Sequence, residues 1–128
     1  MEEIALIDIG KYSGVCDRIR GRVVVLTDKQ REHIIVRREK DFQLCYPHFK
    51  EVIEDPDYIF KDKKHNNTAV ASKTLFFGGQ HVNIVIRLAV EGDREDYLNS
   101  IITMYLESDK RYGQMLRNNI PLYKKEYL

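Results

Sequence analysis

Residues 82–88 constrain the fold most, because hydrophobic and polar side chains alternate along them. Successive side chains of a strand point to opposite faces of a sheet, so the even-numbered residues would be buried while Asn83 and Arg87 lie on the other face. A strand is therefore predicted over residues 82–90, after a hairpin turn at Gly78-Gly79. Neighbouring strands are expected at residues 58–60, 69–77 and 100–106. Together these predict a mainly antiparallel meander of about four strands.

Helices are expected before and after this meander. Thr27 and Gln30 form the Thr-x-x-Gln pattern of a capping box, which starts a helix predicted to run to about Arg38. A second helix is expected over residues 47–55, and a last one over residues 107–118. Short strands should precede these helices at residues 4–9 and 23–26. The pattern indicates an α+β fold, with N-terminal helices packed on the meander and a C-terminal helix.

The length of 128 residues suits a single domain, with a lead-in at residues 1–20 and a basic helix and tail at residues 107–128. The net charge of +1 excludes binding to nucleic acid through a global positive charge, so any polyanion site must be a local patch. No apolar stretch approaches the roughly 20 residues that a membrane span needs. The two cysteines favour a reducing, cytoplasmic compartment, into which a toxin module can also be delivered.

Metal and cysteine chemistry find little support in the sequence. The four histidines are scattered, without a second ligand at a metal-binding spacing, so we expect no metal and no cofactor. Cys45 with a histidine would make a nucleophilic pair, but its neighbours Leu44 and Tyr46 favour a small buried hydrophobic residue instead.

A basic stripe on the first predicted helix is the first candidate site. Lys29, His33 and Arg37 fall at positions i, i+4 and i+8, so they share one helix face. Arg31 and Arg38 add charge to the same helix. A histidine among cations suits the chemistry of a polyanion, whereas the same spacing is also typical of a solvated helix face.

The meander and the C-terminus supply two further candidates. Lys73, Arg87, Thr103 and Tyr105 are predicted to project from three neighbouring strands. Thr103 and Tyr105 should share a face with Ile101, where hydroxyls and cations would bind a phosphate. The alternative is an ordinary solvated sheet face. Residues 110–125 contain Lys110 and Arg111 among cations and tyrosines and no acid, which fits either single-stranded nucleic acid or a protein partner.

Three short motifs resemble one known family. They are the Leu26, Thr27, Arg31, His33, Ile34 and Arg37 pattern, the run Asp55-Pro56-Asp57-Tyr58-Ile59, and the run Ile101-Ile102-Thr103-Met104-Tyr105. Over about residues 23–105 this order is similar to that of the barnase/EndoU/colicin/RelE-like (BECR) nucleases, in their phage and polymorphic-toxin branch. Arg38 stands where the pattern often has a second histidine, and Glu39 where it often has proline.

The resemblance implies a metal-independent ribonuclease whose site lies on the sheet face beside the first helix. Attack of a ribose 2′-hydroxyl on the adjacent phosphate needs a base, an acid and cations. By motif, His33 would be the acid/base and Thr103 a substrate contact, with Tyr105 as its neighbour. The alternation of side chains along the predicted strands adds Lys73 and Arg87 to this candidate site. The residues expected to bind RNA are Lys29, Arg31, Arg37, Arg38, Lys110 and Arg111.

Two other readings stay open. A binding module for RNA or protein, serving a phage particle or a regulatory complex, would keep the fold without the chemistry. In the second alternative, the protein binds an inhibitor or structural partner, such as an antitoxin or immunity protein, through its basic C-terminus. The RNA class, and DNA as an alternative substrate, are equally open.

Overall fold

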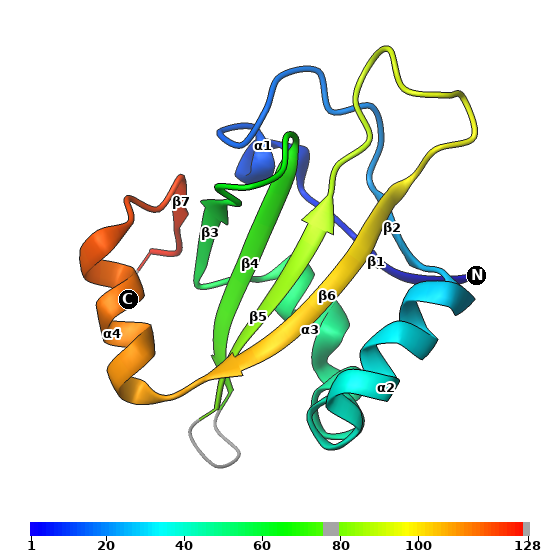
Figure 1. Cartoon of the computed structure of the whole chain (residues 1–128). Coiled ribbons are helices and arrows are strands. Elements are labelled where there is room, and N and C mark those ends of the chain that lie inside the picture. Colours follow the sequence, from blue (N-terminus) through cyan, green and yellow to red (C-terminus); the bar gives the residue numbers. More distant parts are fainter. Residues whose placement is uncertain (76–79, 127–128) are drawn as a thin grey trace.

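A mixed seven-stranded sheet forms the centre of the computed structural model, which describes residues 1–75 and 80–126 (Figure 1). Among these residues the strands are β1 (Glu2–Leu6), β2 (Val23–Leu26), β3 (Tyr58–Lys61), β4 (Thr68–Leu75), β5 (Gln80–Arg87), β6 (Asn99–Glu107) and β7 (Tyr123–Lys124). The helices are α1 (Ile9–Tyr12), α2 (Asp28–Cys45), α3 (Phe49–Glu54) and α4 (Asp109–Asn118), with a 3₁₀ turn at Tyr46–His48 before α3. The α+β class is confirmed.

The sheet is wider than the predicted meander. Its strand order is β1-β2-β6-β5-β4-β3-β7, so the four predicted strands are consecutive antiparallel neighbours at its centre. The short N-terminal strands extend it beyond β6, where β2 runs parallel to β6, and a strand from the C-terminal tail extends it beyond β3. The prediction of about four strands was wrong because it treated these edge strands as separate from the meander.

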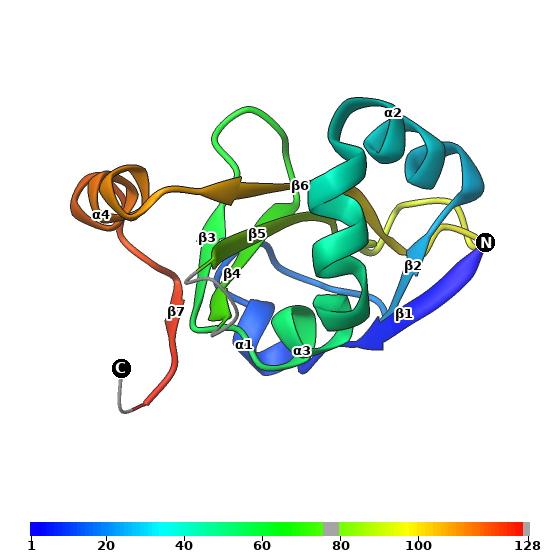
Figure 2. The same ribbon diagram turned by 90° about the horizontal axis from the view of Figure 1, so that it is seen from below.

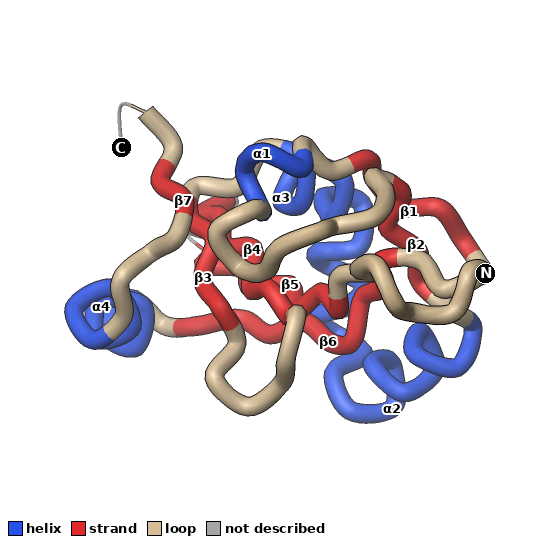
Figure 3. The backbone as a smooth tube through the Cα atoms, turned by 90° about the horizontal axis from the view of Figure 1, so that it is seen from above, coloured by secondary structure: helices blue, strands red, loops and turns tan. Residues whose placement is uncertain are grey.

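The two faces of the sheet differ in what covers them. The core face carries Ala71, Ile84 and Ile101, which belong to the main hydrophobic cluster. The opposite face, called here the open face, carries a small cluster around Phe60 and Val85. Figures 2 and 3 show α1 and α3 on the core side, with α4 and the loop between β3 and β4 on the other side. The first half of α2 buries Ile34 in the main cluster.

Helix α2 begins as predicted and continues past its predicted end. The Thr27 hydroxyl oxygen accepts a hydrogen bond from the Gln30 backbone N–H at 3.2 Å, which confirms the cap. At Arg38 the backbone leaves the helical region (φ −144°, ψ 47°), and the helix bends and continues to Cys45. The residue predicted to end the helix is therefore its kink. Beyond it, Phe42 and Cys45 are buried in the core.

A β-bulge changes the faces of β6. Val85 pairs with Thr103, but the next residue, Ile86, pairs with Ile101, so Ile102 is an extra residue on its strand. Ile101 is therefore fully buried on the core face instead of sharing a face with Thr103, as alternation had predicted. The described residues contain no helix that is long and apolar enough to span a membrane.

Candidate functional site

Three of the four residues predicted to converge on the sheet do share the open face. Tyr105 pairs with Asn83, Thr103 with Val85, and Arg87 with Ser100 on adjacent strands. Val85 and Tyr105 both pack in the small cluster of that face. The strand alternation at Asn83 and Arg87 thus places them on the open face, as predicted.

Lys73 lies on the other side of the sheet. It pairs with Val82, a core-face residue, and its Nζ lies 2.8 Å from the backbone oxygen of Asp55. The same atom is 3.3 Å from a carboxylate oxygen of Asp55 and 3.5 Å from one of Asp57. The predicted convergence of Lys73 with Arg87 and Thr103 was wrong, because the register of β4 against β5 turns its side chain to the opposite face.

Arg87 is held by the loop that follows β5. Its guanidinium forms hydrogen bonds to both carboxylate oxygens of Asp93, at 3.2 and 3.3 Å, and lies 5.3 Å from the ring centroid of Tyr97. The backbone N–H of Val90 and the Arg87 guanidinium lower the pKa of Asp93. This arrangement ties the loop after β5 to the end of that strand.

The basic residues of α2 point in different directions. Arg31 forms an ion pair with Glu2 at 3.1 Å, and its guanidinium lies 4.7 Å from the ring centroid of Tyr46. His33 is exposed in a shallow depression lined by α2 residues alone, Lys29, Gln30, Glu32, His33 and Val36. Arg37 is exposed as well. The structure does not bring His33 and Thr103 into one hollow.

The charge of Arg38 acts on the sheet, where it influences the pKa of Tyr105. Burial raises the pKa of Tyr105, the charges of Glu107 and Asp62 raise it further, and the charge of Arg38 opposes them. The loop after β3 and the middle of β6 meet at this phenol, since Asp62 and Tyr105 line the same hollow. Like any tyrosine, Tyr105 carries its hydroxyl hydrogen at neutral pH and can donate a hydrogen bond.

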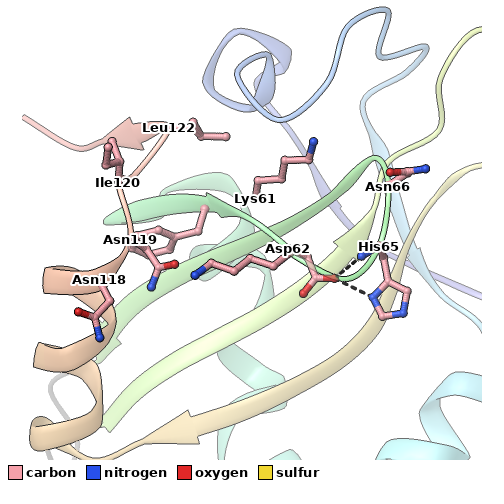
Figure 4. A pocket seen from close by; sticks show the side chains of 10 residues that line it. Lys61, Asp62, His65, Asn66, Asn118, Asn119, Ile120 and Leu122 are labelled. Carbon is pink, nitrogen blue, oxygen red and sulfur yellow. Dashed lines mark hydrogen bonds and ion pairs between the residues drawn. The ribbon is translucent and has the colours of Figure 1, made fainter.

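Two hollows that share lining residues lie between the β3–β4 loop (residues 62–67) and α4, and Figure 4 shows the larger. Both are lined by Phe60, Lys61, Asp62, Lys63 and Asn119. The larger, of about 540 Å³, adds His65, Asn66, Asn118, Ile120 and Leu122. The smaller, of about 360 Å³, adds Lys64, Val70, Tyr105 and Met115. We call the pair the loop hollow.

A histidine and a carboxylate form a pair at the rim of the loop hollow. Asp62 Oδ2 lies 2.7 Å from Nδ1 of His65 and also accepts a hydrogen bond from the His65 backbone N–H at 3.0 Å. The His65 side chain is 64% exposed and that of Asp62 23%, so the ring is open to a ligand while its partner is not. Figure 4 shows this pair on one side of the hollow and Asn118 and Asn119 on the other.

Helix α4, which forms the opposite side, is anchored to the sheet by a polar cluster. Tyr112 is buried, and its hydroxyl accepts a hydrogen bond from the Ser72 hydroxyl at 3.2 Å. His81 bridges Thr74 and Asp109 through its two ring nitrogens, at 2.8 and 2.5 Å. Lys110 and Arg111, in the first turn of α4, are exposed and do not line the loop hollow.

The sequence analysis missed the β3–β4 loop. A signal was present, because residues 61–65 contain Lys61, Lys63 and Lys64 next to Asp62 and His65. Charged residues in a short connecting loop are usually only solvent-exposed. The sequence does not show that this loop faces another element across a hollow. Within residues 1–75 and 80–126, no three His, Cys, Asp or Glu side chains come together as a possible metal site.

The comparisons with known proteins agree with the resemblance found in the motifs. A family model described as phage-Barnase-EndoU-ColicinE5/D-RelE like nuclease3 matches residues 18–113, which include β2 to β6, α2 and the start of α4. Neither a curated protein nor a solved structure gives a significant match. The matched segment covers most of the chain and contains the β3–β4 loop and Tyr105. The chain belongs to the phage-Barnase-EndoU-ColicinE5/D-RelE like nuclease3 family.

Proposed function

We propose that this chain is an endoribonuclease that cleaves RNA on the open face of its sheet without a metal ion. The observation that carries the proposal is the loop hollow, where Lys61, Lys63 and Lys64 lie beside the phenol of Tyr105. A nuclease needs a concave surface that admits a nucleotide and offers cations to its phosphates, and this hollow has both features.

The proposed reaction is an internal transfer of the phosphate. The ribose O2′ attacks the adjacent phosphorus, the bond from phosphorus to O5′ breaks, and the products carry a 2′,3′-cyclic phosphate and a 5′-hydroxyl. Negative charge builds up on the phosphate oxygens in the transition state. Ammonium groups and a protonated phenol placed around the phosphate stabilise that charge, so these side chains can serve where other nucleases use a metal ion.

The residues of the open face support this chemistry in different ways. Tyr105, whose phenol lines the smaller hollow with Lys61, Lys63 and Lys64, would donate its hydroxyl hydrogen to a phosphate oxygen. Thr103, two residues earlier on the same strand face, would contact the next part of the substrate. By the family resemblance His33 is an acid/base residue, and the exposed Lys29 and Arg37 would bind RNA along α2.

The test is cleavage of total RNA by the purified chain in buffer containing EDTA. We expect cleavage that survives chelation and falls by about 10²-fold in Tyr105→Phe, since one hydrogen-bond donor to the transition state is removed. Tyr97→Phe, in the loop between β5 and β6, is a matched control for removal of a tyrosine hydroxyl. Intact RNA that is nevertheless bound in a salt-sensitive way would identify the chain as a binding module instead.

A further inference from the structure

We infer that His65 is the general base of the proposed reaction, positioned by Asp62 at the rim of the loop hollow. The inference rests on the proposed function and adds to it the residue that removes the proton from the 2′-hydroxyl. Neither the sequence motifs nor the family match assigns a role to the β3–β4 loop.

The hydrogen bonds of Asp62 define which nitrogen of His65 is free. A carboxylate can only accept hydrogen bonds, so the Nδ1 atom at 2.7 Å from Oδ2 carries the ring hydrogen. In the neutral ring Nε2 then keeps its lone pair and is the atom that can take up a proton. The second bond, from the His65 backbone N–H to the same oxygen, holds the residue to Asp62 through its main chain as well.

The loop that carries this pair is tied to the sheet at both ends. The backbone N–H of Asp62 donates to the Thr68 oxygen at 2.9 Å, and that of Leu88, just after β5, donates to the Asn67 oxygen at 2.8 Å. Asn67 has a φ of 54°, the left-handed conformation that asparagine tolerates better than most residues. A base on this loop is therefore held in place relative to the sheet and to Tyr105.

The other histidines lack this combination of features. His81 has both ring nitrogens engaged and its ring stacked on Tyr112. His48 stands directly before α3, and its ring faces Glu51 instead of lining the loop hollow. His33 has no hydrogen bond or ion pair to any residue that the structure describes, and no sheet residue lines its depression. Of the four, His65 alone joins a fixed Nδ1–H, an open Nε2 and a hollow rich in lysine.

The step assigned to His65 balances as follows. Nε2 takes the proton from the 2′-hydroxyl as O2′ forms its bond to phosphorus and O5′ leaves with the electron pair of the broken bond. The departing O5′ takes a proton from water, and the imidazolium later returns its proton to the solvent. Asp62 stabilises the imidazolium through the Nδ1 hydrogen bond, so it is a positioning residue and does not touch the substrate.

The test compares His65→Ala with wild type on a short RNA in EDTA. We expect kcat/KM to fall by about 10²–10⁴-fold, the range for loss of a general base. Imidazole added to the buffer should restore part of the rate, because the ring is exposed and its removal leaves room at the rim. A merely structural role would not respond to imidazole. Asp62→Asn keeps an acceptor for the backbone N–H and should lower kcat more than it raises KM.

A matched control comes from a second histidine-carboxylate pair. His48 and Glu51 are also three residues apart, with 4.0 Å between Nδ1 and Oε2, and neither lines the loop hollow. His48→Ala should therefore cleave as wild type does. If His65→Ala cleaves at the wild-type rate, or if imidazole restores none of its lost activity, the role of His65 is overturned while the ribonuclease proposal stands. A wild-type chain that leaves RNA intact overturns both.

Discussion

The ring of His81 lies flat against the ring of Tyr112, with centroids 4.1 Å apart and planes 5° apart. One residue belongs to β5 and the other to α4, so the stack attaches the helix to the sheet. The attachment matters for function because α4 forms one side of the loop hollow.

The first prediction concerns the stability of this attachment. His81→Ala removes the stack and the hydrogen bonds to Thr74 and Asp109, and we expect it to lower the free energy of unfolding by about 1–3 kcal/mol. Tyr112→Phe keeps the ring and removes the hydroxyl with its hydrogen bonds to Ser72 and Thr74, so it should cost about 0.5–1.5 kcal/mol. Urea unfolding of the two variants measures both. Equal stability of His81→Ala and wild type would show that the stack does not hold α4.

The second prediction concerns acid stability. A hydrogen bond from Lys125, helped by Lys73, lowers the pKa of Asp55 below its ordinary value. A carboxyl with a lowered pKa in the folded state stabilises the fold fully above its unfolded pKa, near 3.9, and loses that contribution as the pH falls through the folded value. The stability difference between wild type and Asp55→Asn should therefore be constant near neutral pH and shrink below about pH 4.

Chemical unfolding at several pH values between 7 and 2 measures this difference. Asp96→Asn is a suitable control, since the Asp96 side chain is 79% exposed and only 3.6 Å from Arg94 in an exposed pair. A difference between wild type and Asp55→Asn that grows toward low pH would contradict the assignment.

The third prediction concerns Arg87, which strand parity placed in the catalytic site. Because Arg87 binds Asp93 and packs on Tyr97, Arg87→Ala should lower the free energy of unfolding by about 1–2 kcal/mol. Arg87→Lys should recover only part of this, since an ammonium cannot bind both carboxylate oxygens in the planar way a guanidinium does. Thermal and urea unfolding test the series. Wild-type stability in Arg87→Ala would leave a purely catalytic role as the better explanation.

The fourth prediction concerns the lysines of the loop hollow. Replacing Lys61, Lys63 and Lys64 singly by Gln should weaken RNA binding and reduce the slope of log affinity against log salt by about 1 for each phosphate that the variant no longer neutralises. Lys50→Gln is the control, because Lys50 pairs with Glu54 on α3, on the core side of the sheet. Filter binding or fluorescence anisotropy at several salt concentrations measures the slopes. Unchanged slopes in the three loop variants would place the RNA elsewhere.

Local patterns explain which parts of the fold were predictable. The capping box at Thr27 and the alternation around Asn83 are decided within a few residues, and both agree with the structure. The bulge at Ile102 was not predictable, because it depends on how β6 meets β5 and not on either strand alone. The pairing of β7 with β3 likewise depends on where the chain returns after α4.

The site was harder to predict for the same reason. Lys73 was predicted to lie on the accessible face because its strand was considered without the strand it pairs with. Ala71 and Leu75, which point to the same face as Lys73, are apolar and buried. His65 looked unremarkable as a histidine in a charged loop. Only the fold shows that this loop faces α4 across a hollow and that Asp62 orients the ring. Residues that work together across a gap leave no fixed spacing in the sequence.

The most direct measurement of the central claim uses an RNA oligonucleotide cleaved at one known site, and its twin with a single 2′-deoxyribose on the 5′ side of that bond. In EDTA, we predict that the all-ribose strand gives a 2′,3′-cyclic phosphate end, seen by mass spectrometry, while the deoxy twin stays intact at that bond. Cleavage of the deoxy twin at the same position, or activity that disappears with chelation, would contradict the account.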